Sequence, residues 1–454
     1  MSKVKLICIL LILSFLVTAC ASPQPAAPAP APAPAAEAAE EPATAEPAPE
    51  PEAEVDLDQV SSEDEKEIIF WNLWGGGDGA VLAEMIEEFN NTNPDGIRVI
   101  SLTQDWGQYY TKLRTAFVGG QSPDLAMSHV TRILELQQNR MIMPIDAAFA
   151  DAGIHVDFNN FTSGVIDNIR IGGSYYGVPV DNLTLTLMYN RSVLNSLGLL
   201  GADGRPAIGN DIHSFIHVLQ SIEDSDYIPL QAGQRGFMTQ LLWYTLYKQM
   251  GGGDFLAADL RSVTLDQDIA VRAAQYLQDL YNFTPPHVEN NANLFAEGRT
   301  AFMFEGSWSV SHIAGLIEDD FGVMMFPQFF DQHRIWTDSH AFVLPVKAER
   351  SEQKTNYVLT FIEWFSENNW MWSRAGHLPA NMASWEHPEF IANTHVNSYA
   401  EAGNHGVSFP STQTVWLTFS AEFSEPFEMM INEGADPEAT IDLMIRNLNT
   451  ALTQ

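Results

Sequence analysis

The sequence predicts an α/β protein made of two lobes, with βα units and a largely parallel sheet indicated by residues 68–127. Short apolar runs of strand length alternate with amphipathic stretches of helical length, starting at residues 68–71 and 80–89, and this alternation is typical of βα units. The chain has 454 residues, which is more than a single hydrophobic core usually holds, so we expect two lobes. The sequence has no repeat of solenoid or propeller length, which argues against a repeat architecture.

Each element is predicted from hydrophobic periodicity and from the residues at its ends. Apolar runs predict strands at residues 68–71, 97–102, 123–127, 175–180 and 183–189, the last two separated by Asp181 and Asn182. Apolar residues at helical spacing predict helices at residues 80–89, 109–118, 237–250, 269–281, 351–365 and 416–431. The C-terminal helix has the clearest start, because Asp436 can cap it and Pro437 suits its first position.

The N-terminus has the pattern of a secretory signal peptide at residues 1–19. Lys3 and Lys5 precede an apolar run that ends at Val17 and is too short for a comfortable membrane span. Residues 17–20, Val-Thr-Ala-Cys, resemble a bacterial lipobox, which implies lipid on Cys20 and a mature chain outside the cytoplasm. The alternative is a plain cleaved signal followed by an incidental cysteine.

Cysteine content limits the chemistry of the mature chain. The other cysteine, Cys8, lies inside the predicted signal, so Cys20 is the only one left after cleavage. We therefore expect no disulfide, no thiol metal site and no catalytic cysteine in the mature chain.

The segment from Cys20 to residue 67 is predicted to be a disordered spacer. It is rich in Pro, Ala and Glu, and ten of the chain's 25 prolines fall between residues 21 and 56. Such a composition cannot offset the entropy of ordering, and proline with like charge keeps a chain extended. Its expected role is to hold a globular body away from a membrane surface.

The formal net charge is −36, which argues against nucleic acid and anionic lipid surfaces as partners, because phosphate contacts need clustered Lys and Arg. The acidic surface could attract a cationic substrate, or it could simply keep a secreted protein soluble. We favour solubility.

A glycine-rich motif follows the first predicted strand, at residues 71–80 (WNLWGGGDGA). Gly75-x-Gly77-x-x-Ala80 matches a loose dinucleotide fingerprint, and Asp105 lies in range for a ribose contact. Export weighs against a dinucleotide, and Trp74 would crowd a pyrophosphate. The favoured interpretation is a βα turn whose backbone N–H groups and aromatic rings face a ligand crevice.

A second motif, residues 299–308 (RTAFMFEGSW), runs from an apolar strand into a tight turn. We expect Ser307 to cap a helix extending through Ile313, which would bring Glu305, Ser307 and Trp308 together at a strand end. Sugars need such a set, because hydroxyls bond to carboxylates and the C–H face of a sugar ring packs on an aromatic plane. The alternative is a capped helix with a core tryptophan.

Residues 300–308 (TAFMxxGSW) also resemble the signature of the bacterial extracellular solute-binding proteins of family 1, the sugar receptors of ABC importers. Further landmarks follow the family's order, at residues 119–125, 176–182, 188–191, 249–252, 377–380 and 434–438. The resemblance covers residues 68–454. It departs at residues 205–208 (RPAI), where the family usually has Pro-x-Thr-Trp, and this puts the local ligand contacts in doubt.

The resemblance implies a two-lobed periplasmic-binding-protein fold of type II, with discontinuous lobes joined by crossover hinge strands near residues 178–182 and 337–342. The N-lobe would comprise residues 68–180 and 341–385, and the C-lobe residues 181–340 and 386–454. The implied function is an extracytoplasmic lipoprotein, anchored to the cell membrane in the periplasm or on the outer surface. It would capture a neutral mono- or oligosaccharide and deliver it to the permease subunits of an ABC importer, as a monomer without cofactor or catalysis.

Ligand-binding residues are carried over at matching positions. From the first lobe they are Trp71, Trp74, Asp78, Trp106, Ser128 and His129. From the crossover and second lobe they are Asp181, Asn182, Trp243, Glu305, Ser307 and Trp308, followed by the weaker candidates Asp338, His340 and Trp416. For any single tryptophan, a place in the core is an equally good expectation. We expect His129 and His340 to form hydrogen bonds rather than bind metal, because no second His or acid lies at helical ligand spacing.

A secreted glycoside hydrolase is the alternative from another functional class. Glu305, Asp181 and Asp338 offer carboxylates for an acid and a nucleophile or base, which must lie about 5–9 Å apart. A Gly-x-Ser-x-Gly elbow, a His-Glu-x-x-His site and a P-loop are all missing from the sequence. We therefore favour a binding protein.

Overall fold

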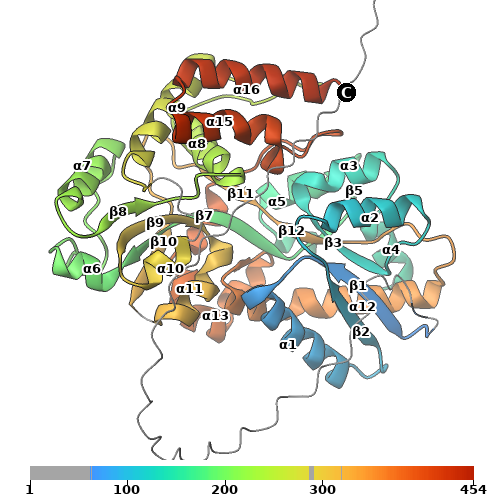
Figure 1. Ribbon diagram of the computed structural model, residues 1–454. Helices are drawn as coiled ribbons and strands as arrows, with labels where there is room; N and C mark the ends of the chain where they lie inside the picture. The colour runs from blue at the N-terminus through green and yellow to red at the C-terminus, as the bar shows by residue number, and fades with distance from the viewer. Residues whose placement is uncertain (1–61, 63, 286–290, 319) are drawn as a thin grey trace, which may run out of the picture. The chain divides into compact units, whose positions relative to one another are not determined.

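The computed structural model describes residues 62, 64–285, 291–318 and 320–454 (Figure 1). The predicted signal peptide, Cys20 and nearly all of the predicted spacer lie outside the described residues. In the part of the chain that is described, no helix has the length and apolar character needed to cross a membrane.

The first sheet has five strands in the order β2-β1-β3-β12-β6. Its strands are β1 (Glu67–Asn72), β2 (Arg98–Thr103), β3 (Leu125–His129), β6 (Val178–Pro179) and β12 (His340–Val343). β1 pairs in parallel with β2 and β3, whereas β12 runs antiparallel to β3 and β6. Figure 1 shows α12 (Glu352–Glu367, orange) beside the blue β1 and α1 (Gly76–Thr92), so distant segments complete this layer.

The second sheet has seven strands around the long β7 (Asp181–Asn190). The path runs β14-β11-β7-β9-β8, and β10 and β13 also pair with β7. The other strands are β8 (Ile228–Gln231), β9 (Thr300–Gly306), β10 (Phe321–Met325), β11 (Ile335–Asp338), β13 (Leu378–Pro379) and β14 (Gly406–Val407). β4 (Arg170–Ile171) and β5 (Ser174–Tyr175) form a separate hairpin.

The second sheet is mainly antiparallel, unlike the parallel sheet predicted from residues 68–127. There β8 with β9 and β11 with β14 are parallel, and every strand that pairs with β7 runs antiparallel to it. The reason is topological, because β7 carries the chain away from the first sheet and its neighbours run back towards that sheet. The break predicted at Asp181 and Asn182 lies at Val180, between the end of β6 at Pro179 and the start of β7 at Asp181.

The remaining helices of the described residues surround these sheets. The α-helices are α2 (Tyr109–Val118), α3 (Ile133–Gln138), α4 (Ile145–Ala152), α5 (Ser163–Ile169), α6 (Arg191–Ser196), α7 (Ile212–Glu223), α8 (Phe237–Gln249), α9 (Gln267–Tyr281), α10 (Asn291–Ala296), α11 (Val310–Ile317), α13 (Pro388–Ala392), α14 (Thr394–Asn397), α15 (Ala421–Glu433) and α16 (Pro437–Leu452). The 3₁₀ turns are η1 (Val130–Arg132), η2 (Phe158–Asn160), η3 (Ser307–Ser309), η4 (Asn369–Ala375), η5 (Met382–Glu386), η6 (Ala400–Asn404) and η7 (Leu417–Phe419).

Capping side chains explain several helix starts. The Asp436 side chain accepts the N–H of Ala439 and Pro437 is the first residue of α16, which confirms the predicted start of the C-terminal helix. The predicted cap at Ser307 is wrong, because its Oγ lies 3.3 Å from the backbone N of Thr184 and accepts that N–H instead. The single helix predicted at residues 416–431 is divided into η7 and α15.

Two large apolar clusters form the cores. One draws on residues between 68 and 180 and between 341 and 380, and the other on residues between 183 and 336 and between 402 and 452. Each core is therefore assembled from segments far apart in the sequence. This confirms the predicted two-lobed α/β fold with discontinuous lobes.

Structure also extends into the segment predicted to be a spacer. Glu67 is the first residue of β1, and the buried Lys354 amine donates to the carbonyl oxygens of Ser62 and Asp64 at 3.1 and 3.0 Å. The Lys66 amine likewise donates to the carbonyl oxygen of Asp95. The last residues before β1 therefore stabilise the first lobe.

Candidate functional site

A cavity of about 230 Å³ is lined by residues that follow strands of both sheets. The β1–α1 turn, the segment before α2 and the end of β3 contribute from the first sheet. β7, β11, the start of α8, η3 and η7 contribute from the second. The lining residues are Leu73, Trp74, Gly75, Asp78, Trp106, His129, Leu183, Phe237, Trp308, Trp336, Asp338, His340, His377, Thr418 and Phe419.

Six aromatic rings dominate this cavity, and they come from both lobes. Trp106 lies with its ring centroid 4.6 Å from that of Phe419, and Phe237 lies 4.8 Å from Phe419. Trp308 contacts Phe237 at 5.9 Å and Trp336 at 6.2 Å. Such a surface offers flat apolar faces to a ligand, and the indole N–H of Trp336 is left as a hydrogen-bond donor.

The glycine-rich turn places Trp74 and Asp78. Gly76 has φ of +55°, and a Cβ on Gly79 would lie 2.8 Å from the carbonyl oxygen of Trp74, so both positions require glycine. The Asn72 side chain accepts the backbone N–H of Trp74 and fixes the turn. The Trp74 ring then packs 4.9 Å from Trp372. The glycines therefore serve the local path of the chain, as a βα turn facing a crevice requires.

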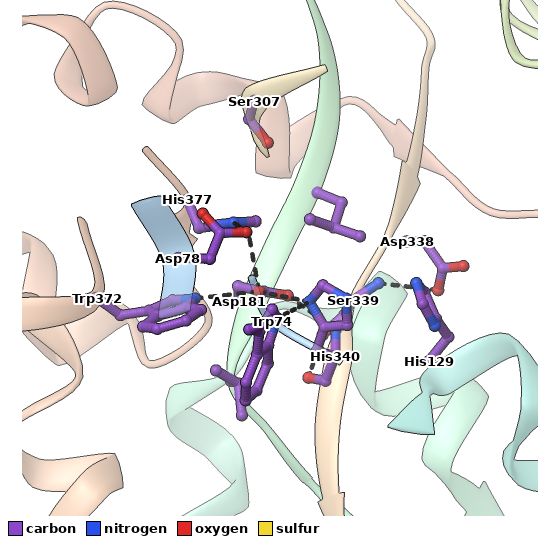
Figure 2. Close-up of polar contacts among 12 residues, drawn as sticks. Trp74, Asp78, His129, Asp181, Ser307, Asp338, Ser339, His340, Trp372 and His377 are labelled. Carbon is purple, nitrogen blue, oxygen red and sulfur yellow. Dashed lines mark hydrogen bonds and ion pairs between the residues drawn. The ribbon is translucent and has the colours of Figure 1, made fainter. Parts of the chain in front are cut away.

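Asp181 is the centre of a buried polar cluster behind the cavity (Figure 2). Its Oδ1 accepts the backbone N–H of His340 at 2.8 Å, and its Oδ2 accepts the His340 Nδ1–H at 2.7 Å and the Trp372 indole N–H at 3.1 Å. Burial raises the pKa of Asp181, but His340 and His377 outweigh it and bring the pKa below its usual value. Asp181 is therefore an anion that joins the crossover strands β7 and β12.

His377 lies between two carboxylates. Its Nε2 is 3.0 Å from Oδ2 of Asp78 and its Nδ1 is 3.4 Å from Oδ2 of Asp181, and the side chain has no exposed surface. Burial lowers the pKa of His377, but Asp78 and Asp181 outweigh burial, and the pKa lies above its usual value. This residue was missing from the sequence-based site.

Asp338 is a buried carboxyl with both oxygens occupied. Oδ1 accepts the backbone N–H of Ser339 and Oδ2 accepts the Thr131 hydroxyl, each at 2.8 Å. Burial raises the pKa of Asp338 to about 6, against the lowering effect of these hydrogen bonds and of His340. Asp338 is thus held in place across the site by the first lobe's Thr131.

His129 is held as a neutral imidazole. Its Nδ1 lies 2.6 Å from the Tyr110 hydroxyl, which also accepts the backbone N–H of His129. Since that hydroxyl oxygen already accepts, its proton is free to go to Nδ1, and the His129 ring proton then lies on Nε2. Burial, His340 and Arg132 lower the pKa of His129 well below its usual value.

Three polar atoms of the lining have no hydrogen-bond partner among the described residues. They are the indole Nε1 of Trp336, the hydroxyl of Thr418 and Nδ1 of His377, which are all buried, and Nδ1 of His377 lies within ion-pair distance of Asp181. A buried donor without a partner costs about 1–3 kcal/mol. A ligand with acceptor atoms would remove that cost.

The structure brings part of the predicted site together. The predicted residues that line the cavity are Trp74, Asp78, Trp106, His129, Trp308, Asp338 and His340. Trp416 flanks it, with its indole N–H donating to Thr131 at 3.1 Å and its ring 3.9 Å from Phe419. Asp181 lies one layer deeper, behind His340.

The other predicted residues lie elsewhere. Trp243 is fully buried in the second core, where its indole N–H donates to the carbonyl oxygen of Ala270. Trp71 lies in the first core. Ser128, Asn182, Glu305 and Ser307 make hydrogen bonds within the fold and do not line the cavity.

Sequence reasoning missed the lining residues Leu73, Gly75, Leu183, Phe237, Trp336, His377, Thr418 and Phe419. For one of them a signal was available, because Trp336 and Asp338 are two apart in β11 and therefore share a face. His377 stood in a motif used for the family resemblance, but its neighbours in space come from α1 and β7. Spacing along the chain gives no hint of that contact.

Asp181, His340 and His377 also lie close enough to share a metal ion, their ligand atoms being within 4.8 Å of one another. The sequence pattern did not predict this group, because its members are distant in sequence. The surroundings of these three side chains favour protonated histidines over a bound metal ion. The Trp372 indole N–H and a backbone N–H already point at Asp181, and Nε1 of Trp74 lies 3.4 Å from Nδ1 of His340. A metal ion in this group would have to replace the proton that His340 Nδ1 donates to Asp181.

The fold and the cleft-like site define a ligand receptor, and the chain belongs to the bacterial extracellular solute-binding proteins, whose family model matches residues 75–371. It is a solute-binding protein that acts outside the cytoplasm. The glycoside hydrolase alternative gains no support from this assignment.

Individual relatives are distant. The chain is 19% identical over 359 residues to the maltotriose-binding protein of Pyrococcus abyssi, which covers 76% of this chain and 73% of the relative. The GacH receptor of Streptomyces glaucescens, solved unliganded and with acarbose, has a TM-score of 0.71 at 18% identity, over 86% of this chain and 98% of that one. UgpB of Mycobacterium tuberculosis, in complex with glycerophosphocholine, also has a TM-score of 0.71 at 18% identity, over 85% and 98%. These structures share the fold.

Proposed function

We propose that the chain captures a neutral carbohydrate between its lobes and delivers it to an ABC permease without catalysis. The observation that carries this proposal is the lining of the cavity, which combines six aromatic rings with Asp78, Asp338 and histidines. The lining contains no Lys or Arg among the described residues. An anionic ligand such as a phosphodiester would find no unpaired cation there, because His377 lies between the carboxylates of Asp78 and Asp181, whereas sugar hydroxyls and C–H faces would be satisfied.

Binding without chemistry is supported by the positions of the three carboxylates that a hydrolase would have used. Asp181 and Glu305 do not line the cavity, and both oxygens of Asp338 are occupied by Ser339 and Thr131. A glycosidase needs two carboxyl groups facing the scissile bond. The arrangement instead suits hydrogen bonding to hydroxyls.

Closure of the two lobes is the proposed mode of capture. The proposed N-lobe comprises residues 68–180 and 341–385 and the C-lobe residues 181–340 and 386–454, in keeping with the two apolar clusters. A ligand that contacts Trp74 in one lobe and Trp308 in the other stabilises the closed state by its differential affinity. The closed state would then present the surface that the permease recognises.

The chain is also proposed to act as a monomer tethered to the membrane through lipid on Cys20. The support is the signal pattern of residues 1–19 and the small residues before Cys20. A long Pro-rich spacer gives the tethered body freedom to reach a permease.

Calorimetry with a panel of ligands tests the function. The panel comprises glucose, maltose, maltotriose, xylobiose and sn-glycerol 3-phosphate, each followed by analysis for hydrolysis products. We expect at least one neutral sugar to bind and to be recovered intact. Binding of the phosphate ester alone, or release of shorter sugars, would contradict the proposal. Trp308→Ala is the matched variant that should lose the heat of binding.

A further inference from the structure

His377 occupies a position that a neutral imidazole cannot satisfy. Both ring nitrogens face carboxylate oxygens, Nε2 towards Asp78 at 3.0 Å and Nδ1 towards Asp181 at 3.4 Å. A carboxylate only accepts hydrogen bonds, and a neutral imidazole carries one N–H. One of the two contacts would then set a nitrogen lone pair against an anion in a fully buried place.

An imidazolium resolves this conflict, because it carries a proton on each nitrogen and so turns an N–H, in place of a lone pair, towards Asp181 at ion-pair distance. Asp181 has no proton to offer, since it already accepts from His340 and Trp372. Asp78 lies in the first turn of α1 and lines the cavity, with its side chain 16% exposed. His377 Nε2 contacts Oδ2 of Asp78, so Oδ1 is the oxygen of this carboxyl that a ligand in the cavity would use.

We propose that His377 is an imidazolium that positions Asp78 for the ligand, so that carbohydrate binding requires a proton at His377. This inference rests on the proposed function. His377 is a positioning residue, and its hydrogen bond to Oδ2 of Asp78 fixes the orientation of that carboxyl group. Through Asp181 it also connects α1 to the crossover strands β7 and β12.

Other charged groups near His377 do not replace this role. The groups on the elements packed around it are Asp78 and Glu84 on α1, Asp181 on β7, His340 on β12, Arg374 on η4, His312 on α11 and Tyr399 beside η6. Arg374 pairs with Glu84 at 3.0 Å and His312 is exposed. Burial raises the pKa of Tyr399, so its phenol stays neutral.

Nitrogen NMR of histidine-labelled full-length protein gives the direct test. At pH 7.5 we expect both ring nitrogens of one histidine to be protonated, and His377→Gln should remove that signal. His217→Gln, an exposed histidine on α7, is the matched control and should leave it unchanged. A bare nitrogen on His377 at this pH would overturn the proposal.

The pH profile is the functional readout. With maltotriose as the probe, wild-type affinity should fall about tenfold per pH unit above the pKa of His377, while His377→Gln should bind weakly and with a flat profile. Maltotriose affinity independent of pH in the wild type would overturn the proposal. Absence of maltotriose binding at every pH would count against the ligand class alone, since the NMR result still decides the protonation of His377.

Adding zinc ions distinguishes a protonated His377 from a metal site at the same residues. In this proposal both ring nitrogens of His377 carry protons and cannot bind a metal. One equivalent of Zn²⁺ should therefore leave the melting temperatures of the wild type and of His377→Gln unchanged. A rise in the wild type that His377→Gln abolishes would show a metal site instead and overturn the proposal.

Discussion

The Trp308 indole lies directly over the backbone of Gly306. A Cβ placed on Gly306 would meet three ring carbons of Trp308 at 2.2 to 2.3 Å. Gly306 has φ of −85°, so the glycine is required by the ring and not by the backbone conformation. The position of Trp308 in the cavity thus depends on the missing side chain of its neighbour.

Truncating this tryptophan should separate binding from stability. We expect Trp308→Ala to weaken carbohydrate binding by about 1–3 kcal/mol with little change in melting temperature, because the ring is a partly exposed anchor. Calorimetry and thermal unfolding of the same sample measure both.

The control is Trp243→Ala, which removes a fully buried ring from the second core and should cost about 3–5 kcal/mol of stability. Gly306→Ala should reproduce the binding defect by displacing the ring. A collapsed melting temperature with intact affinity in Trp308→Ala would remove Trp308 from the site.

The sequence predicted the lobed fold and several element ends well, because these follow from local signals. Asp436 and Pro437 mark the start of α16, and residues 109–118 match α2. Trp308 was also found, since the turn that places it is local. Trp243 could not be told from a ligand-binding ring, because only packing against α9 and α15 makes it core. His377 was missed because its contacts with Asp78 on α1 and Asp181 on β7 join segments that are distant in the sequence.

The protonation of Asp338 should make stability depend on pH. Its pKa of about 6 is above the unfolded value, so the native state holds a proton that the unfolded chain releases between about pH 4 and pH 6. Its contribution to the free energy of unfolding therefore decreases as the pH rises through that window. Asp338→Asn should remove this dependence and stabilise the protein at pH 7 by about 2–3 kcal/mol.

Denaturant unfolding at pH 4.5 and pH 7 measures this effect. Asp203→Asn, a change of a surface carboxyl, is the control and should keep the wild-type profile. If Asp338→Asn and the wild type differ equally at both pH values, the carboxyl does not titrate in this range.

Deletion of the N-terminal segment should be harmless up to Ser62 and costly beyond it. A chain starting at residue 62 keeps the acceptors of Lys354, whereas one starting at Ile68 leaves that buried ammonium without the carbonyls of Ser62 and Asp64. We expect the shorter chain to lose about 1–3 kcal/mol. Thermal unfolding of both chains, each with and without Lys354→Met, measures the effect. If the lost stability comes from Lys354, the two chain lengths should be equally stable once Lys354 is replaced.

Membrane attachment should depend on Cys20. Lipid chains contribute about 0.8 kcal/mol per buried CH₂, so two or more anchor firmly. We expect the wild type to partition into the detergent phase and Cys20→Ser into the aqueous phase when both are expressed in a bacterial host. Partitioning of the wild type into the aqueous phase would contradict the lipobox interpretation.

The place of β12 in the first sheet has a consequence for how the protein is made. β12 joins β3 to β6, yet residues 178 to 343 must be translated before that strand exists. At ribosomal rates of about 5–20 residues per second, the first half of the chain waits roughly 10–30 s for its partner strand. During that interval the edge of β3 that pairs with β12 has no partner strand, and the first lobe cannot complete its native sheet. Translocation of an unfolded chain, which a secreted protein needs, can take place before folding competes with it.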